Sequence, residues 1–475
     1  MIFNSITFLV FSTIFFPLYF ALKGRLQLWL CLIASYIFYG WWDERFLSLI
    51  VISTLIDYTV GNLLDKTESP DKRKRLLVIS LIVNLGFLAF FKYCDFFIGS
   101  FTELANSIGV TPSFNTLNII IPVGISFYTF QSMSYTIDVY YKKIPVEKDF
   151  IRFATFISFF PQLVAGPIVR ASDFLPQFKR VRTFDWDRFN KGTGQILWGF
   201  FQKVAVADSL APFVDQCFAA PEGFSSLHLL IGVIFYSFQI YCDFSGYSNI
   251  AIGLARIMGF DFPDNFRTPY FSKNFSEFWQ RWHISLSSWL RDYLYIPLGG
   301  SRHGVFNTYK NNMLTMLLGG LWHGPTWVFV FWGFLHGLYL IVQRVIGPKF
   351  GQLLTAIRLP QFGRNAINIS LVYFFTCFAW IFFRSPDFAT ALNVITGVGG
   401  LENFNFSSVI NKFWVVKGFL LIGILLMIEL ADFQFNFADK ILTKPVFRVV
   451  SFASILWLIA FFGSFGSNSF IYFQF

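Results

Sequence analysis

Charged residues are scarce in this sequence. Only 13% of the 475 residues are Asp, Glu, Lys or Arg, whereas 55% are hydrophobic and 67 are Phe. A soluble chain carries about 25% charged residues, so this composition excludes an ordinary soluble protein. The apolar residues recur in runs of roughly 17–25, the length at which a helix crosses the bilayer core. We therefore expect an all-α polytopic integral membrane protein.

Familiar catalytic and metal-binding signatures are also missing. The sequence has no HExxH motif, no Walker loop and no GxSxG motif, and its five cysteines show no CxxC spacing. The sequence therefore lacks the motifs typical of zinc proteases, NTP hydrolases and serine hydrolases. The cysteines are expected to pack as small hydrophobic residues, and no bound metal or other bound cofactor is predicted.

Long polar stretches, internal repeats and linkers are lacking as well. We therefore expect residues 1–475 to form a single membrane-embedded domain in contact with lipid. The net charge of +10 lies in short loops between apolar runs, which is typical of membrane orientation and not of nucleic-acid binding. The first run, residues 1–20, lacks the basic start and the small-residue cleavage site of a signal peptide, so it is predicted to remain as a span.

The Lys and Arg residues predict which loops face the cytoplasm. Lys23 and Arg25 follow the first run, so the N-terminus is expected outside, and the basic segment 72–75 is expected inside. The alternation continues through three later spans near residues 367–384, 413–431 and 447–465. The C-terminal tail would then emerge outside.

One apolar segment, residues 151–169, breaks this alternation because basic residues flank both of its ends. It contains Pro161, Gly166 and Pro167, which a straight helix tolerates poorly. We expect a re-entrant hairpin, which is tolerated at membrane depth only where protein or a water-filled cavity surrounds it.

A second segment with basic residues at both ends is residues 313–343, which is too long for one span and too short for two. Gly319-Gly320 and Gly324-Pro325 interrupt it, and His323 lies ten residues into it. At about 1.5 Å per residue this depth is about 15 Å, near the bilayer midplane. A broken helix with a histidine at mid-depth is typical of sites inside membranes.

Two histidines are candidates for chemistry. His323 follows Trp322 between glycines, and a histidine there can act as a general base or can be a packed, hydrogen-bonded core residue. His283 lies in residues 278–293, whose alternating charges and aromatics predict an amphipathic helix at the interface, functional or merely anchoring. His336 is expected to pack or to hydrogen-bond to a backbone carbonyl.

Three aspartates, Asp57, Asp138 and Asp243, lie in or near apolar runs. Asp243 belongs to a polar patch, residues 241–248. Such a carboxylate lines a reaction chamber, or it pairs with an arginine or caps a broken helix. Trp322 is a second candidate for the chamber lining.

At these motifs the chain resembles the membrane-bound O-acyltransferase (MBOAT) family. It is most similar to the bacterial branch that includes the alginate O-acetylation and teichoic acid D-alanylation membrane proteins. The matching segments, in order, are residues 160–168, 243–248, 265–270, 281–287 and 319–324.

The resemblance implies about ten spanning helices, with re-entrant and interfacial helices that form a funnel. It implies catalytic roles for His323 and His283, with acetyl-CoA, or more broadly an acyl-CoA or an acyl carrier, as donor. The acceptor implied is an extracytoplasmic polysaccharide such as alginate. It is reached from the bacterial cytoplasmic membrane through an SGNH-type O-acetyltransferase partner.

We expect His323 to act as general base on an acceptor hydroxyl, and His283 to orient the acyl carbonyl or to stabilise charge on it. A transporter or flippase for a polysaccharide precursor is the first alternative, although it would favour internal symmetry, which the sequence lacks. A non-catalytic scaffold of an export complex is the second.

The C-terminal tail, residues 470–475, carries no charged side chain and contains Tyr472. It resembles the ends of the alginate branch. A nearby histidine can take the proton of a phenol as it attacks a thioester, so Tyr472 is a candidate acyl relay. The alternative is that the aromatic tail only anchors at the interface.

Overall fold

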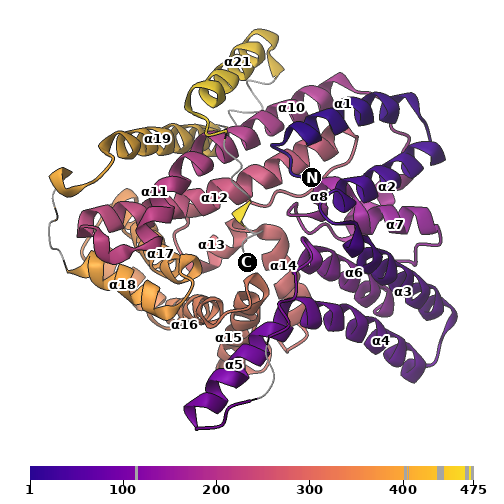
Figure 1. Cartoon of the computed structure of the whole chain (residues 1–475), viewed down its shortest axis with the longest axis horizontal. Helices are drawn as coiled ribbons and strands as arrows, with labels where there is room; N and C mark the ends of the chain where they lie inside the picture. The colour runs from indigo at the N-terminus through magenta and orange to yellow at the C-terminus, as the bar shows by residue number, and fades with distance from the viewer. Residues whose placement is uncertain (113–115, 401–403, 405, 436–442, 466–469, 472–475) are drawn as a thin grey trace. The chain divides into compact units, whose positions relative to one another are not determined.

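The computed structural model describes residues 1–112, 116–400, 404, 406–435, 443–465 and 470–471. These residues form helices, turns and coil, with no strand among them, which confirms the all-α class (Figure 1). They fall into two compact units, residues 1–196 with 250–263 and residues 197–249 with 264–475. The expectation of a single domain stays a prediction.

The first unit consists of short and medium helices joined by turns. Its helices are α1 (Ile6–Ala21), α2 (Arg25–Gly40), α3 (Leu47–Lys66), α4 (Pro70–Leu88), α5 (Cys94–Ser107), α6 (Ile125–Tyr140), α7 (Phe150–Ser158), α8 (Phe160–Leu163) and α9 (Ala171–Phe174). A π-helical turn, η2 (Ala89–Tyr93), joins α4 to α5.

The second unit holds the longer helices. Its helices are η4 (Phe201–Ala207, π-helical), α11 (Asp208–Ala219), α13 (Phe275–Arg281), α14 (Ile284–Leu290), η7 (Arg291–Tyr295, π-helical), α15 (Gly304–His323), α16 (Trp327–Ala356), α17 (Gln361–Arg384), α18 (Phe388–Gly399), α19 (Lys412–Phe435) and α21 (Pro445–Phe462). Two helices, α10 (Trp186–Phe200) and α12 (Ser226–Ile257), contribute residues to both units.

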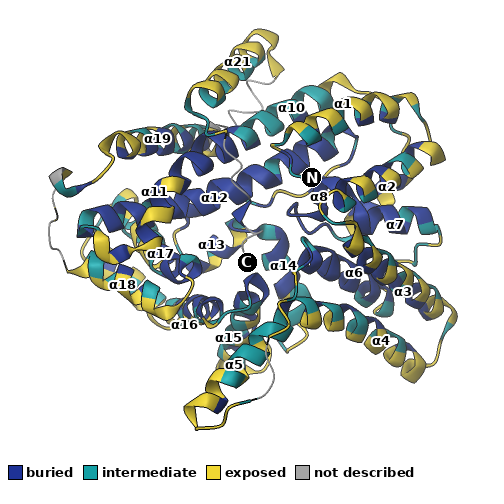
Figure 2. Ribbon diagram, viewed as in Figure 1, coloured by how far each residue is buried: buried dark blue, intermediate teal, exposed yellow. Residues whose placement is uncertain are grey.

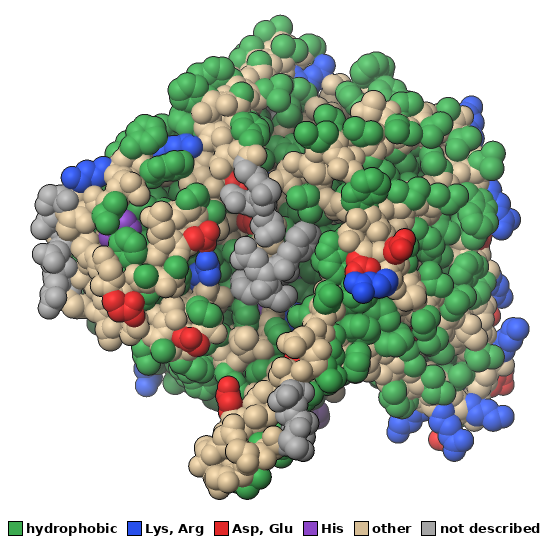
Figure 3. Space-filling view, in the orientation of Figure 1, with side chains coloured by type: hydrophobic (Ala, Val, Ile, Leu, Met, Phe, Trp, Pro, Cys, Tyr) green, Lys and Arg blue, Asp and Glu red, His purple; other side chains and the backbone are tan. Residues whose placement is uncertain are grey.

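The apolar runs of the sequence become membrane-length helices. In the described part of the chain, seven helices are long and apolar enough to cross a bilayer, and α1 and α18 are apolar but shorter. Many of their large hydrophobic residues are exposed, and exposed positions recur along the helices in Figure 2. Hydrophobic side chains cover much of the face in Figure 3. Lipid is the solvent that suits such surfaces, so this is a multi-pass membrane protein. The later predicted spans correspond to α17, α19 and α21.

A buried carboxylate joins three helices of the first unit. Asp57 of α3 is 0% exposed, and it accepts hydrogen bonds from Ser80 and Asn84 of α4 and from Ser132 and Thr136 of α6. Burying a carboxylate is costly unless its oxygens are hydrogen-bonded, and four neutral donors meet that need here. Asp57 is therefore a structural junction.

The segment 151–169 is broken, as its prolines and glycine predict. Helix α7 ends at Ser158, α8 spans only Phe160–Leu163, and both are almost wholly buried. Gly124 adopts φ +76 before α6, and a Cβ there would lie 2.6 Å from the carbonyl oxygen of Leu163. Glycine is therefore required for this contact. The re-entrant path across the membrane stays a prediction.

In the second unit, α15 and α16 pack as a tight hairpin around the second predicted break. A Cβ on Gly320 would lie 2.3 Å from the Phe329 carbonyl oxygen and 3.1 Å from the Cα of Gly333, so small residues let the two backbones meet. The break falls after His323, at residues 324–326. The expected interruption at Gly319-Gly320 is absent, because these glycines serve packing within a continuous helix.

Four of the cysteines are buried, Cys94 is half-buried, and all five are free. This confirms that they pack as small side chains rather than forming disulfides.

Candidate active site

The hairpin places His323 inside the second unit. It is the last residue of α15 and is 3% exposed. Its ring makes edge-on contacts with Trp322, Trp332 and Phe383, at centroid distances of 5.0, 5.0 and 5.3 Å. A Cβ on Gly324 would lie 2.1 Å from the Phe329 ring, so a larger residue there would displace the aromatic wall.

His283 lies at a helix break, which corrects the expectation of one amphipathic helix over residues 278–293. Helix α13 ends at Arg281 and α14 begins at Ile284. His283 between them has φ 43, a left-handed conformation that is strained for a residue with a Cβ. Within the stretch, Trp282 and His283 are buried, at 1% and 0% exposure, and the interfacial position stays a prediction.

Backbone pairing holds this strained residue in place. Arg267 N–H donates to the Arg281 carbonyl and Ile284 N–H donates to the Asn265 carbonyl, both at 2.9 Å. The two bonds bracket His283 on either side. Strain of this kind persists where surrounding structure over-determines the conformation, and it clusters at functional sites.

The Asn265 side chain fixes the tautomer of His283. Its Oδ1 accepts from the backbone N–H of Ser285 at 3.2 Å and lies 3.1 Å from His283 Nδ1. Because a backbone N–H can only donate, this oxygen is the acceptor, and Nδ1 of the imidazole carries the proton. Nε2 is then a hydrogen-bond acceptor.

Burial lowers the pKa of His283 to about 3, because the charged imidazolium loses its hydration. The ring is therefore neutral near pH 7. Both roles expected for His283, orienting the acyl carbonyl and stabilising charge on it, need a proton on Nε2, because a carbonyl oxygen accepts hydrogen bonds. The neutral Nδ1–H tautomer lacks that proton, so this geometry instead fits the orientation of a hydrogen-bond donor.

The two candidate histidines lie together. Their ring centroids are 6.4 Å apart, and Trp322 contacts both, at 6.0 Å from His283 and 5.0 Å from His323. Sequence motifs forty residues apart thus supply one buried aromatic chamber. Trp322, predicted as a lining residue, forms a wall shared by both rings.

His336 packs behind this chamber, as expected. Its ring is 0% exposed and lies 4.7 Å from Trp332 and 5.1 Å from Trp279. No hydrogen-bond partner for either ring nitrogen exists among the residues that the structure describes. The expected alternative, a hydrogen bond to a backbone carbonyl, is therefore absent there.

Asp243 of α12 lies one aromatic ring away from His283. The neighbouring Phe244 stacks edge-on against the His283 ring at 4.6 Å. Asp243 is 3% exposed, and its Oδ1 lies 2.5 Å from Lys203 Nζ, which is also 2.8 Å from Asp208 Oδ1. Pairing with a cation is thus confirmed, and the cation is a lysine instead of the expected arginine.

Lys203 remains charged inside the protein. Burial acts most strongly and lowers its pKa, but the negative charges of Asp243 and Asp208 together outweigh burial and raise the pKa above the ordinary value. Lys203 lies on the π-helical turn η4, and such turns are frequent at functional sites.

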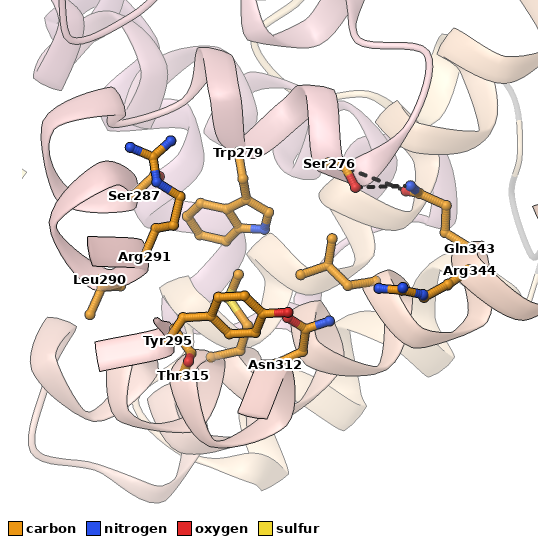
Figure 4. Close-up of a pocket in the computed structure, with 12 residues that line it drawn as sticks. Ser276, Trp279, Ser287, Leu290, Arg291, Tyr295, Asn312, Thr315, Gln343 and Arg344 are labelled. Atoms are coloured by element: carbon orange, nitrogen blue, oxygen red, sulfur yellow. Dashed lines mark hydrogen bonds between the residues drawn. The ribbon is translucent and has the colours of Figure 1, made fainter. Parts of the chain in front are cut away.

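A pocket of about 400 Å³ opens beside the chamber. Arg291 and Arg344 lie on opposite sides of it, with Trp279 and Tyr295 between them (Figure 4). Its remaining lining residues are Ser276, Ser287, Leu290, Asn312, Thr315, Met316, Leu340 and Gln343.

The pocket is lined in part by α15, the helix that ends at His323. Met316 precedes His323 by seven residues on that helix, which is about 10 Å at 1.5 Å per residue. On another side, the lining residue Trp279 contacts Trp332 at 5.9 Å, and Trp332 contacts His323. Trp279 and Trp332 therefore link the pocket lining to His323.

Asn265 and Lys203 were not predicted as site residues. Asn265 stood in a matching motif without an assigned role, and a lone lysine in the apolar run 194–207 was the available signal for Lys203. Asp243 lies forty residues from Lys203, and His283 lies eighteen residues from Asn265. Tyr472 lies outside the described residues.

Comparison with known proteins agrees with the motifs. The family model described as MBOAT, membrane-bound O-acyltransferase family, matches residues 43–383, which is more than half of the chain. That range includes both histidines, Asn265, Asp243 and the pocket.

Individual proteins show the same similarity. The chain is 42% identical over 393 residues to the probable alginate O-acetylase AlgI of Pseudomonas putida, covering 82% of this chain and 79% of that protein. It is 38% identical over 404 residues to a peptidoglycan O-acetyltransferase of Helicobacter pylori, covering 79% and 74%. Over 250 residues it is 31% identical to a teichoic acid D-alanyltransferase of Streptococcus thermophilus, covering 49% and 60%.

These matches favour a catalyst over the transporter and scaffold alternatives. All three relatives are named for acyl transfer. This multi-pass protein belongs to the membrane-bound O-acyltransferase family and is an acyltransferase.

Proposed function

We propose that this acyltransferase, as one domain over its whole length, moves an acetyl group from cytosolic acetyl-CoA across the bacterial cytoplasmic membrane. The final acceptor is an extracytoplasmic polysaccharide such as alginate. The observation that carries the proposal is the pair of buried histidines, His283 and His323, joined through Trp322. The relatives named for alginate and peptidoglycan O-acetylation support the acetyl group and the class of acceptor.

The pocket supports a donor that carries phosphate. Two guanidinium groups line it, and arginine binds phosphate oxygens through planar, charge-assisted hydrogen bonds. Arg344 and Lys349 follow the apolar part of α16, and this distribution of basic residues predicts that the part of α16 around Arg344 faces the cytoplasm. A thioester on a long arm can enter here while its phosphates stay at the arginines. Acetyl-CoA fits this description, and an acyl carrier protein is the competing donor.

His323 acts as general base in this proposal. It takes the proton from an attacking hydroxyl while the hydroxyl oxygen bonds to the thioester carbon, and the proton then passes to the departing thiolate. His283 orients the hydroxyl by accepting a hydrogen bond at Nε2, and Trp322 lines the chamber. General-base assistance is typically worth about 10²–10⁴ in rate.

Tyr472 is the proposed first acceptor. Its phenol oxygen bonds to the acetyl carbon, the carbon–sulfur bond breaks, and the products are O-acetyl-tyrosine and the free thiol of CoA. A second transfer moves the acetyl group to an SGNH-type O-acetyltransferase partner or to the polysaccharide, which regenerates the phenol. Dividing the path in this way carries only the acyl group across the membrane, and the thioester stays in the cytosol.

The test uses purified protein in vesicles with acetyl-labelled acetyl-CoA. We expect label in a C-terminal peptide of the parent, detected by mass spectrometry, and none in Tyr472→Phe, which keeps the ring and deletes the hydroxyl. Replacing acetyl-CoA by an acetylated carrier protein distinguishes the donors. Full polysaccharide acetylation in Tyr472→Phe would eliminate the relay, and absence of any label transfer from either donor would contradict the proposed function.

A further inference from the structure

The described C-terminal residues, Phe470 and Ile471, are held inside the second unit. They are 2% and 4% exposed. The backbone N–H of Ile471 donates a hydrogen bond of 2.7 Å to Oδ2 of Asp243. The Phe470 ring packs on Tyr247 at 4.9 Å and on Phe244 at 5.9 Å. These contacts hold both residues in the interior of the second unit.

The acceptor in this contact is oriented independently of the tail. Lys203 holds Oδ1 of Asp243 and is itself held by Asp208. A Cβ on Gly246 would lie 2.9 Å from the backbone nitrogen of Lys203, so α12 and η4 are in close backbone contact. The carboxylate is therefore fixed by its own helices, with Oδ2 directed to the tail.

Charge explains why the carboxylate binds a backbone N–H. The single Lys203 ammonium is shared between two carboxylates, those of Asp208 and Asp243. Charged groups in a protein interior need further donors, and a hydrogen bond to a carboxylate is stronger than one between neutral groups. Ile471 supplies such a donor.

The docked residues also lie next to the chamber. Phe244 contacts Phe470 on one side and His283 on the other. In the proposed function, Ile471 directly precedes the acetyl carrier Tyr472 in the sequence.

From this geometry we propose that Asp243 is a positioning residue that seats the C-terminal segment of the chain beside the histidine pair. Lys203 and Asp208 orient it for this purpose. Seating is a property of the described residues alone. Its effect on rate rests on the proposed function, in which the tail carries the acetyl group.

The first experiment measures seating directly. Ile471→Cys, in a background with the five native cysteines replaced, keeps the backbone N–H and reports on burial through its rate of maleimide labelling. Adding Asp243→Ala is expected to raise that rate at least about tenfold, the equivalent of one charge-assisted hydrogen bond. With Asp243→Asn, the labelling rate should lie between those of the Asp243 parent and Asp243→Ala, because the amide oxygen can still accept the N–H of residue 471.

The matched control is Asp57→Asn, a similarly buried aspartate in the first unit. It is expected to leave the rate of maleimide labelling at the introduced thiol unchanged. Thermal unfolding of each variant identifies general destabilisation. Parent-like labelling in a folded Asp243→Ala variant would overturn the seating, as would an equal rise in Asp57→Asn.

A second experiment removes only the donor. Ile471→Pro lacks the N–H and leaves the Lys203 cluster intact, whereas Ile471→Val keeps the N–H as the conservative rescue. We expect Ile471→Pro to lower kcat for acetyl transfer about tenfold with KM for acetyl-CoA unchanged, and Ile471→Val to restore it. A change in KM alone would refute a positioning role.

The two experiments separate failure of the inference from failure of the proposed function. If Asp243→Ala releases the tail but Tyr472→Phe keeps full activity, the seating stands and the relay is wrong. If labelling does not change while Tyr472→Phe is inactive, the relay stands and Asp243 does not hold the tail.

Discussion

Asp57 and Asp243 are both helical aspartates in apolar surroundings, and both are nearly inaccessible, at 0% and 3% exposure. Their partners differ. Asp57 receives four neutral donors from α4 and α6 of its own unit. Asp243 is bound by the Lys203 ammonium and by a backbone N–H near the chain terminus.

This difference in partners distinguishes Asp57, a structural carboxylate, from Asp243, which we propose to be a positioning residue. Neutral hydroxyl and amide donors satisfy Asp57 completely and join helices that need no further ligand. The cluster around Asp243 contains a lysine shared by two carboxylates, adjoins Phe244, which contacts the His283 ring, and binds a segment that is not part of any long helix. Burial is therefore common to both aspartates, and the nature of the hydrogen-bond partners distinguishes the structural junction from the residue proposed to position the C-terminal segment.

The largest expected effect concerns chemistry at the site. His323→Gln keeps a similar volume and removes the imidazole base, so acetyl transfer should fall about 10²–10⁴-fold. Thermal stability in detergent should change little. Labelled acetyl transfer in vesicles measures the rate, and Trp322→Phe is a control for packing in the same chamber. Parent-like turnover in His323→Gln would remove His323 from the mechanism.

The second prediction concerns Asp57, where we expect a loss of stability without a loss of activity. Asp57→Asn presents an amide NH₂ to donors that previously met an oxygen, which leaves at least one of them unsatisfied and costs about 1–3 kcal/mol of stability. The midpoint of thermal unfolding should fall, while acetyl transfer per folded molecule stays at the parent level. A selective loss of transfer with unchanged stability would place Asp57 in the reaction and cancel the contrast with Asp243.

Sequence reasoning found the helices and the histidines, for identifiable reasons. Apolar runs long enough to span a bilayer leave little alternative to a helix, so α17, α19 and α21 were predicted near their observed bounds. The break beside His323 followed from Gly324-Pro325, since proline and glycine disfavour helix interiors.

The pairings were not predictable, because they depend on packing between distant segments. Nothing local relates Lys203 to Asp243, forty residues away, or Asn265 to the tautomer of His283. The left-handed backbone at His283 was equally hidden, since histidine normally favours the right-handed region. Backbone hydrogen bonds from residues 281 and 284 to residues 267 and 265 hold this conformation. Because those bonds cannot be seen in the sequence, the pattern of residues 278–293 predicts one amphipathic helix.

The third prediction asks whether a site residue also affects stability. His283 has a folded-state pKa of about 3, against about 6.5 when unfolded. Between these values the unfolded state binds more protons, so this contribution is complete above pH 6.5 and is lost as pH falls toward 3. From pH 7 to 5 the loss is about 2 kcal/mol.

Thermal unfolding of the parent and of His283→Gln at pH 7, 6 and 5 measures the contribution of His283 to the free energy of unfolding. The parent should lose stability faster than the variant as pH falls, because glutamine does not titrate. Parallel pH profiles would show that the imidazole is hydrated or already paired with a charge.

The smallest effect concerns a cation in a different setting from Lys203. Two buried carboxylates neutralise Lys203, whereas Arg344 is exposed and makes no ion pair with any residue in the described ranges. Its charge is therefore available to a ligand in the pocket. Arg344→Gln should raise KM for acetyl-CoA about tenfold with kcat nearly unchanged, since a phosphate contact made equally in ground and transition states affects binding alone. Arg358→Gln removes the same charge outside the pocket and serves as the control. A fall in kcat at constant KM would mean that Arg344 acts on the transition state, and equal effects in both variants would reduce the pocket to a general electrostatic surface.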